Sequence, residues 1–239
     1  FVDRIREMSV EITSFMAENK GKHILFEGAQ GILLDIDIGT YPFVSSGNSS
    51  AAGAAAGGGI GPRGIDRILG VFKAYSTRVG NGPFPTEFRD DRDGDLEQVV
   101  RETGREYGVT TGRPRRCGYL DLVALKYACR ANSIDSLVLT HIDVYDEMDV
   151  IQACVAYECD GKNITDFPAS SKVLEKAQPV TKSFKGWKKT ISEVKTYEDL
   201  PQEAKEYIQF IEDFTETSID VISVGYQRSQ TMIRKEIWS

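Results

Sequence analysis

The sequence predicts an α/β fold with a mixed, mostly parallel central sheet and flanking helices. Short apolar runs that read as strands are followed by stretches with helical spacing of apolar residues. Several runs end in turns of glycine or polar residues, as strands do at the ligand-binding edge of a parallel sheet. The dipeptide Asp160-Gly161, placed between two further apolar runs, predicts a hairpin, so the sheet should also contain antiparallel strands.

The beginning of the chain is expected to hold a helix, a strand and a segment of small residues. The helix should reach residues 19–21, because apolar side chains recur at steps of three and four: Val2, Ile5, Met8, Ile12 and Phe15. Residues 23–27 precede a glycine turn and are predicted to be a strand. Residues 45–61 are mainly Gly, Ala and Ser, a composition typical either of a flexible linker or of closely packed backbone.

The rest of the chain is predicted to alternate strands with helices. Residues 67–79 should form one or two strands, ended by the loop 80–85. Further strands are expected at 137–139, 150–157 and 220–223, and helices at 95–107, 119–131 and 201–214. The helix at 119–131 should bury Leu120, Val123, Leu125 and Ala128. Residues 178–198 are rich in lysine and are expected to be an irregular surface segment.

Composition excludes some classes of function. The formal net charge of -7 argues against nucleic acid as the main partner, because contacts with phosphates need a basic face. No apolar run is long enough to cross a bilayer, so we expect no membrane partner. The four cysteines form no Cys-x-x-Cys pair and no cluster with the two histidines, so no metal site is predicted in this chain. They indicate a cytoplasmic protein with reduced, buried thiols.

The segment Thr110-Thr111-Gly112-Arg113-Pro114-Arg115-Arg116 is the most informative short motif. Three guanidinium groups on one loop of an acidic chain suit bidentate binding of phosphate or carboxylate. The threonine hydroxyls and the glycine backbone add further hydrogen-bond donors, and the proline fixes the turn. The alternative interpretation is a solvated run of charge. The residues alone leave both interpretations open.

Three other segments could contact a purine base. Asp143, in Thr140-His141-Ile142-Asp143 after an apolar run, could accept hydrogen bonds from the N1–H and 2-amino group of guanine. Gln30, in a glycine turn, offers both a donor and an acceptor, and Ser223-Val224-Gly225 offers a hydroxyl and bare backbone. Each segment could equally be a plain turn or helix cap. The sequence contains neither G-x-x-x-x-G-K-[ST] nor a strand-to-helix G-x-G-x-x-G motif.

Taken together, these segments resemble the adenylosuccinate synthetase family. Four segments occur in the order found in that family, from about His23 to the end: FEGAQGILLDIDIGTYPFVSSGN, KAYSTRVGNGPFPTE, TTGRPRRCGYLDLVALKYA and THIDVYD. The resemblance implies a ligase of purine biosynthesis that uses GTP and Mg²⁺ to join IMP and L-aspartate into adenylosuccinate. It also implies a cytoplasmic homodimer. Residues 1–239 would then be the C-terminal part of a single domain. The phosphate-loop part, with the Mg²⁺ ligands and the acid–base residues, would lie upstream.

The resemblance also implies roles for individual residues. Gln30 would be the catalytic residue that bonds the hypoxanthine ring near the reacting oxygen, and Ser45 would contact the IMP phosphate. The aspartate-binding loop would comprise Val109, Thr110, Thr111, Gly112, Arg113, Pro114 and Arg115. In that loop Arg113 would reach aspartate and the IMP ribose, and Arg115 would lie close to GTP. The guanine site would comprise His141, Ile142, Asp143, Ser223, Val224 and Gly225.

The chain departs from the family pattern at three of these places. His141 stands where the family has lysine, so the fixed positive charge is lost at neutral pH. Tyr226 stands in place of a proline, and Ser45 in place of a threonine. Without the upstream part, the 239-residue chain alone is expected to be inactive. The alternatives are a non-catalytic guanine-nucleotide-binding module and a structural or interaction domain.

Overall fold

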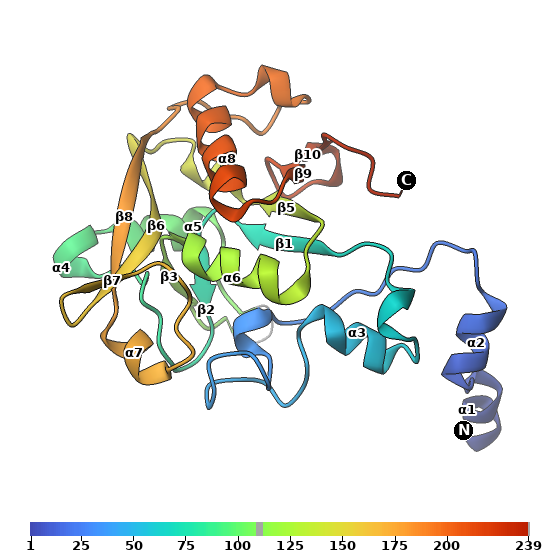
Figure 1. Ribbon diagram of the computed structural model, residues 1–239. Helices are drawn as coiled ribbons and strands as arrows, with labels where there is room; N and C mark the ends of the chain where they lie inside the picture. The colour runs from blue at the N-terminus through green and yellow to red at the C-terminus, as the bar shows by residue number, and fades with distance from the viewer. Residues whose placement is uncertain (109–111, 239) are drawn as a thin grey trace. The chain divides into compact units, whose positions relative to one another are not determined.

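The computed structural model describes residues 1–108 and 112–238, which form two compact units. The first unit is Phe1–Ile68 together with Trp238, and the second is Leu69–Ile237. Helices and strands of both units are labelled in Figure 1. The described residues thus hold an α/β protein whose sheets all belong to the second unit.

The first unit is helical and holds no strand among its described residues. Its helices are α1 (Val2–Met8), α2 (Ile12–Glu18) and α3 (Ala51–Gly57), with 3-10 turns η1 (Ile32–Leu34) and η2 (Pro62–Gly64). The single helix predicted for the start is wrong, because Ser9 is extended and ends α1. The Glu11 carboxylate then caps a second helix by accepting hydrogen bonds from the backbone nitrogens of Thr13 and Ser14, at 3.1 and 2.7 Å.

Two further predictions for this unit need correction. The strand expected at residues 23–27 is absent, because no described residue pairs with this exposed segment and a strand needs a partner for its backbone hydrogen bonds. Residues 45–61 contain α3, so the flexible-linker interpretation is wrong for them. Close packing explains Gly58 instead, since a Cβ there would lie 2.4 Å from the ring of Phe26.

A buried carboxylate organises the loop that contains Ser45. Asp35 is inaccessible to solvent, and its two oxygens accept hydrogen bonds from four backbone nitrogens at 2.7–3.2 Å: those of Asp37, Ile38, Ser49 and Ser50. Burial alone would raise the pKa of Asp35, but these bonds favour the ionised form and hold it below its ordinary value. The carboxylate therefore joins both ends of the loop 35–50.

The second unit contains every strand of the described chain. They are β1 (Leu69–Lys73), β2 (Ser76–Arg78), β3 (Arg116–Gly118), β4 (Leu120–Asp121), β5 (Ser136–Thr140), β6 (Val150–Cys159), β7 (Lys162–Ile164), β8 (Gln178–Lys185), β9 (Ile219–Ser223) and β10 (Thr231–Ile233). The helices of this unit are α4 (Asp90–Asp93), α5 (Leu96–Thr103), α6 (Leu122–Asn132), α7 (Ser171–Lys176) and α8 (Gln202–Thr215). Short 3-10 turns are η3 (Ile142–Tyr145), η4 (Tyr197–Asp199) and η5 (Arg228–Gln230).

The main sheet has the strand order β1-β5-β9-β10. Strand β5 pairs in parallel with both β1 and β9, whereas β10 runs antiparallel to β9. The predicted mixed, mostly parallel sheet is therefore confirmed. Parallel pairing places the carboxyl ends of β1, β5 and β9 at one edge, where ligands bind in open α/β sheets.

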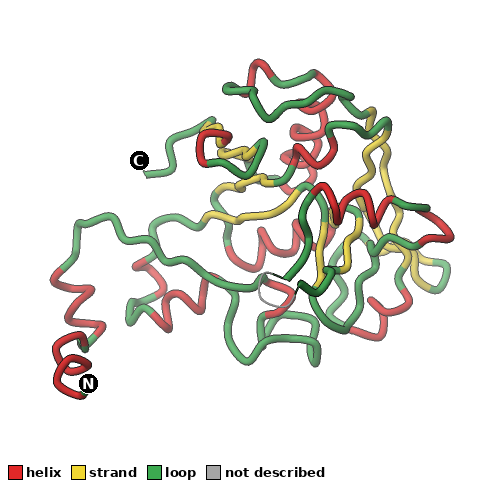
Figure 2. Tube along the Cα trace, turned by 180° about the vertical axis from the view of Figure 1, so that it is seen from behind, coloured by secondary structure: helices red, strands yellow, loops and turns green. Residues whose placement is uncertain are grey.

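A second sheet is built around β6. The predicted hairpin of β6 and β7 is confirmed, and β4 pairs with β6 in parallel. The irregular segment predicted at residues 178–198 is wrong in its first part, because β8 pairs antiparallel with β6 from Val150↔Lys185 to Glu158↔Gln178. Figure 2 shows this pair as two long strands side by side. The burial of β8 does not alternate along the strand, since residues 178–181 are all half-buried, so its sequence carries no period-two signal.

Helices α6 and α8 pack against each other and fill the core beside the main sheet (Figure 1). Val123 and Leu125 of α6 are buried as predicted, and Ala128 is half-buried, whereas Leu120 is buried in β4 and not in the helix. All four cysteines are buried and free, which agrees with the prediction that these thiols are buried or half-buried. The carbonyl of Ala74, just after β1, accepts hydrogen bonds from the hydroxyls of Tyr145 (3.0 Å) and Tyr207 (3.2 Å). These bonds fix the chain where it leaves the main sheet.

Candidate functional site

The carboxyl edge of the main sheet brings together segments that are far apart in the sequence. Strand β1 ends at Lys73, opposite Thr140 at the end of β5, and β9 ends beside them at Ser223. His141 to Asp143 and Ser223 to Gly225 follow β5 and β9 directly. The structure thus places both segments of the predicted guanine site at one edge.

His141 turns the chain sharply after β5. Its backbone has φ 59°, and its ring meets Tyr75 edge-on, with the centroids 5.8 Å apart. Its Nδ1 lies 3.3 Å from the Tyr75 hydroxyl. Burial lowers the pKa of His141, and the charge of Lys73 lowers it further. The imidazole is therefore neutral at pH 7.

Asp143 lies in the first turn of η3 and is half-buried. Burial raises its pKa, and a hydrogen bond from its own backbone only partly offsets this effect. Within residues 1–108 and 112–238, no other residue donates a hydrogen bond to this carboxylate. A half-buried acceptor without such donors can receive two N–H groups of a ligand.

The turn after β9 is held by Gln230, a residue that no sequence motif singled out. The backbone nitrogen of Val224 donates to the carbonyl of Gln230 (2.9 Å), and the Ser223 hydroxyl donates to the carbonyl of Gly225 (2.8 Å). A Cβ at Gly225 would lie 2.3 Å from the side-chain oxygen of Gln230, so a larger residue here would displace that side chain. Tyr226 is exposed and stacks beneath the guanidinium of Arg105, 5.1 Å from its ring centroid.

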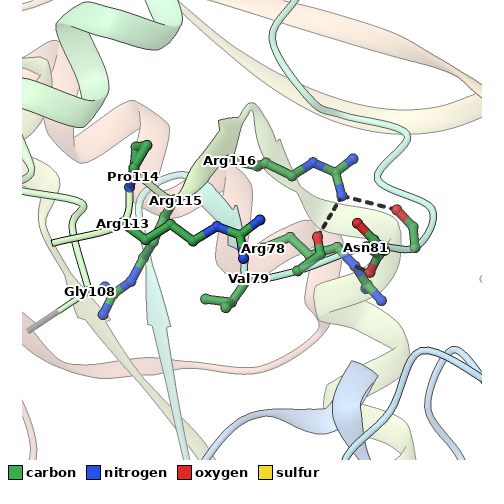
Figure 3. Close-up of a pocket in the computed structure, with 10 residues that line it drawn as sticks. Arg78, Val79, Asn81, Gly108, Arg113, Pro114, Arg115 and Arg116 are labelled. Atoms are coloured by element: carbon green, nitrogen blue, oxygen red, sulfur yellow. Dashed lines mark hydrogen bonds between the residues drawn. The ribbon is translucent and has the colours of Figure 1, made fainter. Parts of the chain in front are cut away.

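A cavity of about 600 Å³ lies beside the arginine motif. Four arginines line it, together with residues 79–82, Gly108 and Pro114: Arg78, Arg113, Arg115 and Arg116. Figure 3 shows these side chains coming from the end of β2, the start of β3 and the loop before it, with the Arg115 guanidinium directed away from the other three. Of the aspartate loop, Gly112, Arg113 and Pro114 are exposed, whereas Val109, Thr110 and Thr111 lie outside the described residues.

The arginines of this cavity are held to different degrees. Arg116 forms a bidentate pair with Glu87, at 2.5 Å for both bonds, and its Nη1 donates to the carbonyls of Gly80 and Gly82, each at 3.1 Å (Figure 3). Arg78 is buried and donates to the carbonyl of Asn81 at 3.2 Å. Burial and the nearby charge of Arg116 lower the pKa of Arg78. Placing this cation here therefore costs free energy that an anionic ligand would offset.

Glu106 connects the cavity to the sheet edge. Its side chain is 1% exposed and accepts hydrogen bonds from Lys73 Nζ (2.6 Å), the Tyr75 hydroxyl (2.5 Å) and Arg115 Nη1 (2.8 Å). Burial alone would raise the pKa of Glu106, but these three donors hold it below its ordinary value. A continuous series of contacts therefore runs from Arg115 through Glu106 and Tyr75 to His141.

Gln30 and Ser45 belong to the first unit. Gln30 is exposed and has φ 64°, in the left-handed region of backbone conformation. The Ser45 hydroxyl donates to the carbonyl of Leu34 at 2.9 Å.

The described residues also limit what the chain could hold or cross. No group of three or more His, Cys, Asp or Glu side chains in the part that the structure describes could hold a metal ion. No helix there is long and apolar enough to span a membrane.

The fold and the cavity define an α/β protein with a mixed sheet, a polar carboxyl edge and an arginine-lined cavity. The family model described as adenylosuccinate synthetase matches residues 1–232, and the chain belongs to this family. This finding confirms the resemblance inferred from the sequence motifs.

Relatives and a solved structure agree with this assignment. Adenylosuccinate synthetases of Desulforamulus reducens and Clostridium perfringens are 47% and 49% identical to this chain. The matches cover 100% and 99% of its length. A fully ligated adenylosuccinate synthetase from Plasmodium falciparum matches with a TM-score of 0.91 and 40% identity over 97% of this chain. The chain spans 55% of the length of each of these three proteins.

Proposed function

We propose that the complete gene product joins IMP and L-aspartate into adenylosuccinate with GTP, and that this chain supplies part of the IMP, aspartate and guanine sites. One observation carries this proposal. In a member of this family, a series of contacts links an arginine-lined cavity to a sheet edge that bears Asp143. All three substrates are anions, which suits a cavity lined by four guanidinium groups.

In this reaction GTP transfers a phosphoryl group to the 6-oxygen of IMP, and the amine of aspartate then displaces phosphate. Arg113 would reach aspartate and the ribose of IMP, and Arg115 would lie close to GTP. Both belong to the aspartate-binding loop, which would also comprise Val109, Thr110, Thr111, Gly112 and Pro114. Gln30 would hold the hypoxanthine ring, and Ser45 the phosphate of IMP. Mg²⁺ would neutralise the phosphates of GTP when bound. The described residues offer no ligand cluster for it, so its ligands would lie elsewhere in the complete gene product.

The guanine site in this proposal comprises His141, Ile142, Asp143, Ser223, Val224 and Gly225. Guanine would present N1–H and the 2-amino group to the Asp143 carboxylate. Because hydrogen bonds to the charged form lower a carboxyl pKa, guanine would offset the effect of burial on Asp143. A cytoplasmic location and a homodimer belong to the same proposal.

The test is product formation by the complete gene product. Purified protein is incubated with IMP, aspartate, GTP and Mg²⁺, and adenylosuccinate and phosphate are measured. We expect both products in equal amounts, and neither when any one substrate is omitted. Tight binding of guanine nucleotides without product would favour the alternative of a non-catalytic nucleotide-binding module.

A further inference from the structure

The ionised carboxylate of Glu106 determines where the hydroxyl proton of Tyr75 lies. With three donors around it, Glu106 is an acceptor only. The Tyr75 hydroxyl has one proton, and its shortest contact is with Glu106, at 2.5 Å. The same contact raises the pKa of Tyr75, after the larger effect of burial, so its proton is retained. Toward every other neighbour the Tyr75 oxygen can therefore only accept a hydrogen bond.

His141 is that other neighbour. Its Nδ1 lies 3.3 Å from the Tyr75 oxygen, so Nδ1 must carry the proton that Tyr75 accepts. In a neutral imidazole the other ring nitrogen is then an acceptor. Four charged groups act on this ring: Lys73 and Arg115 disfavour the imidazolium, while Glu106 and Asp143 favour it. Burial together with the two cations prevails, and His141 stays neutral.

We propose that Glu106 and Tyr75 are positioning residues that hold His141 as the Nδ1–H tautomer, so that Nε2 accepts a hydrogen bond from a donor group of the bound nucleotide. No described residue forms a hydrogen bond with Nε2, which leaves it available to a ligand. A lysine at this position could only donate. His141 would therefore accept a hydrogen bond where a lysine would donate one, and so it selects an N–H or O–H group on the nucleotide. The nucleotide part of this inference rests on the guanine site proposed above.

The tautomer can be read directly, because the chain has only two histidines. The 239-residue chain is labelled with ¹⁵N-histidine, and the chemical shifts of the ring nitrogens are recorded at neutral pH. A His23→Gln variant, which changes an exposed residue of the other unit, assigns the signals. We expect His141 in the Nδ1–H form. An Nε2–H form, or a charged ring at neutral pH, would overturn the inference without any variant of the site.

Two tyrosine variants test the cause. Tyr75→Phe removes the acceptor for Nδ1–H, so His141 should shift toward the Nε2–H tautomer. Tyr145→Phe is the matched control, because it removes a buried hydroxyl from the same aromatic cluster but leaves the contact between Tyr75 and His141 intact. An unchanged His141 tautomer in Tyr75→Phe, or an equal change in both variants, would show that Tyr75 does not set it.

GDP binding, measured by calorimetry on the complete gene product, distinguishes the positioning of His141 from the guanine site itself. Tyr75→Phe should weaken GDP binding about two- to tenfold, since one hydrogen bond is lost, and Tyr145→Phe should not. If both variants keep wild-type affinity, Nε2 does not contact the nucleotide and the inference fails. If the wild-type protein shows the Nδ1–H form but binds no GDP, the positioning of His141 stands and the guanine site falls.

Discussion

The four arginines of the cavity differ in what already holds them. Arg116 is occupied by Glu87 and two backbone carbonyls, whereas the Arg113 side chain is exposed. The run of three arginines in the sequence therefore combines a structural residue with candidate ligand-binding ones. This difference predicts that alanine at position 116 mainly lowers stability, whereas alanine at position 113 mainly lowers activity.

Arg116→Ala should lower the free energy of unfolding by about 1–3 kcal/mol, because Glu87 and two carbonyls lose their donor. Arg113→Ala should change it by less than about 0.5 kcal/mol, as exposed positions usually do. In the complete gene product, Arg113→Ala should reduce kcat/KM for aspartate about 10- to 100-fold through the loss of a charge-assisted contact. Urea unfolding and aspartate saturation measure these effects. Wild-type kinetics in Arg113→Ala would support a solvated run of charge.

Part of the site could be predicted from single residues, and part could not. The motif with Arg113 and Arg115, and the strand ends before His141 and Ser223, have local signals in the sequence. Glu106 has none, because it is separated from Lys73 by 33 residues and acquires its role only when β1 and the loop before β3 meet. In the sequence, a glutamate between Arg105 and Tyr107 looks like any surface acid.

Helix α6 begins at an aspartate whose burial has a measurable consequence. Asp121 caps the helix by accepting from the backbone nitrogen of Ala124 (2.9 Å), and it accepts from the Tyr157 hydroxyl at 2.6 Å. Burial nevertheless raises the pKa of Asp121 to about 6. The folded state thus binds this proton more tightly than the unfolded state does. The resulting stabilisation is complete below the ordinary pKa of 3.8 and is lost as pH rises through about 6.

Asp121→Asn keeps a capping oxygen and removes this titration. The unfolding free energy of the variant, minus that of the wild type, should rise by up to about 3 kcal/mol between pH 4 and 7. Tyr157→Phe should enlarge the wild-type trend, because it removes a donor that lowers the pKa of Asp121. Denaturant unfolding across this pH range is the measurement. A difference that does not vary with pH would contradict the assignment.

Elements with a clear periodicity were predictable, and those defined by a distant partner were not. Helix α8 and strand β5 have continuous apolar patterns, and both lie where they were expected. Strand β8 was missed because its pairing with β6 stabilises a segment whose side chains are mostly half-buried or exposed. Residues 23–27 have the strand pattern but no partner among the described residues. Strand propensity alone reveals neither the pairing of β8 nor the lack of a described partner for residues 23–27.

At the scale of the whole chain, the sheet edge and the cavity offer candidate binding groups. The sequence contains no phosphate loop of the G-x-x-x-x-G-K-[ST] type, and the described residues offer no metal cluster. We therefore expect the 239-residue chain alone to form no adenylosuccinate from IMP, aspartate, GTP and Mg²⁺. Circular dichroism first establishes that the chain is folded. Measurable product from the folded chain would contradict this expectation.

Asp143→Asn is the most direct test of the proposal that this chain binds the guanine of GTP for a ligase reaction. The complete gene product is assayed for adenylosuccinate with GTP and with XTP, for the wild type and the variant. Xanthine has an oxygen where guanine has the 2-amino group, and asparagine offers one donor and one acceptor to match it. A mismatched buried polar group costs about 1–3 kcal/mol, so the ratio of kcat/KM for XTP over GTP should rise about 10- to 100-fold. An unchanged ratio in an active, folded variant would contradict the guanine site.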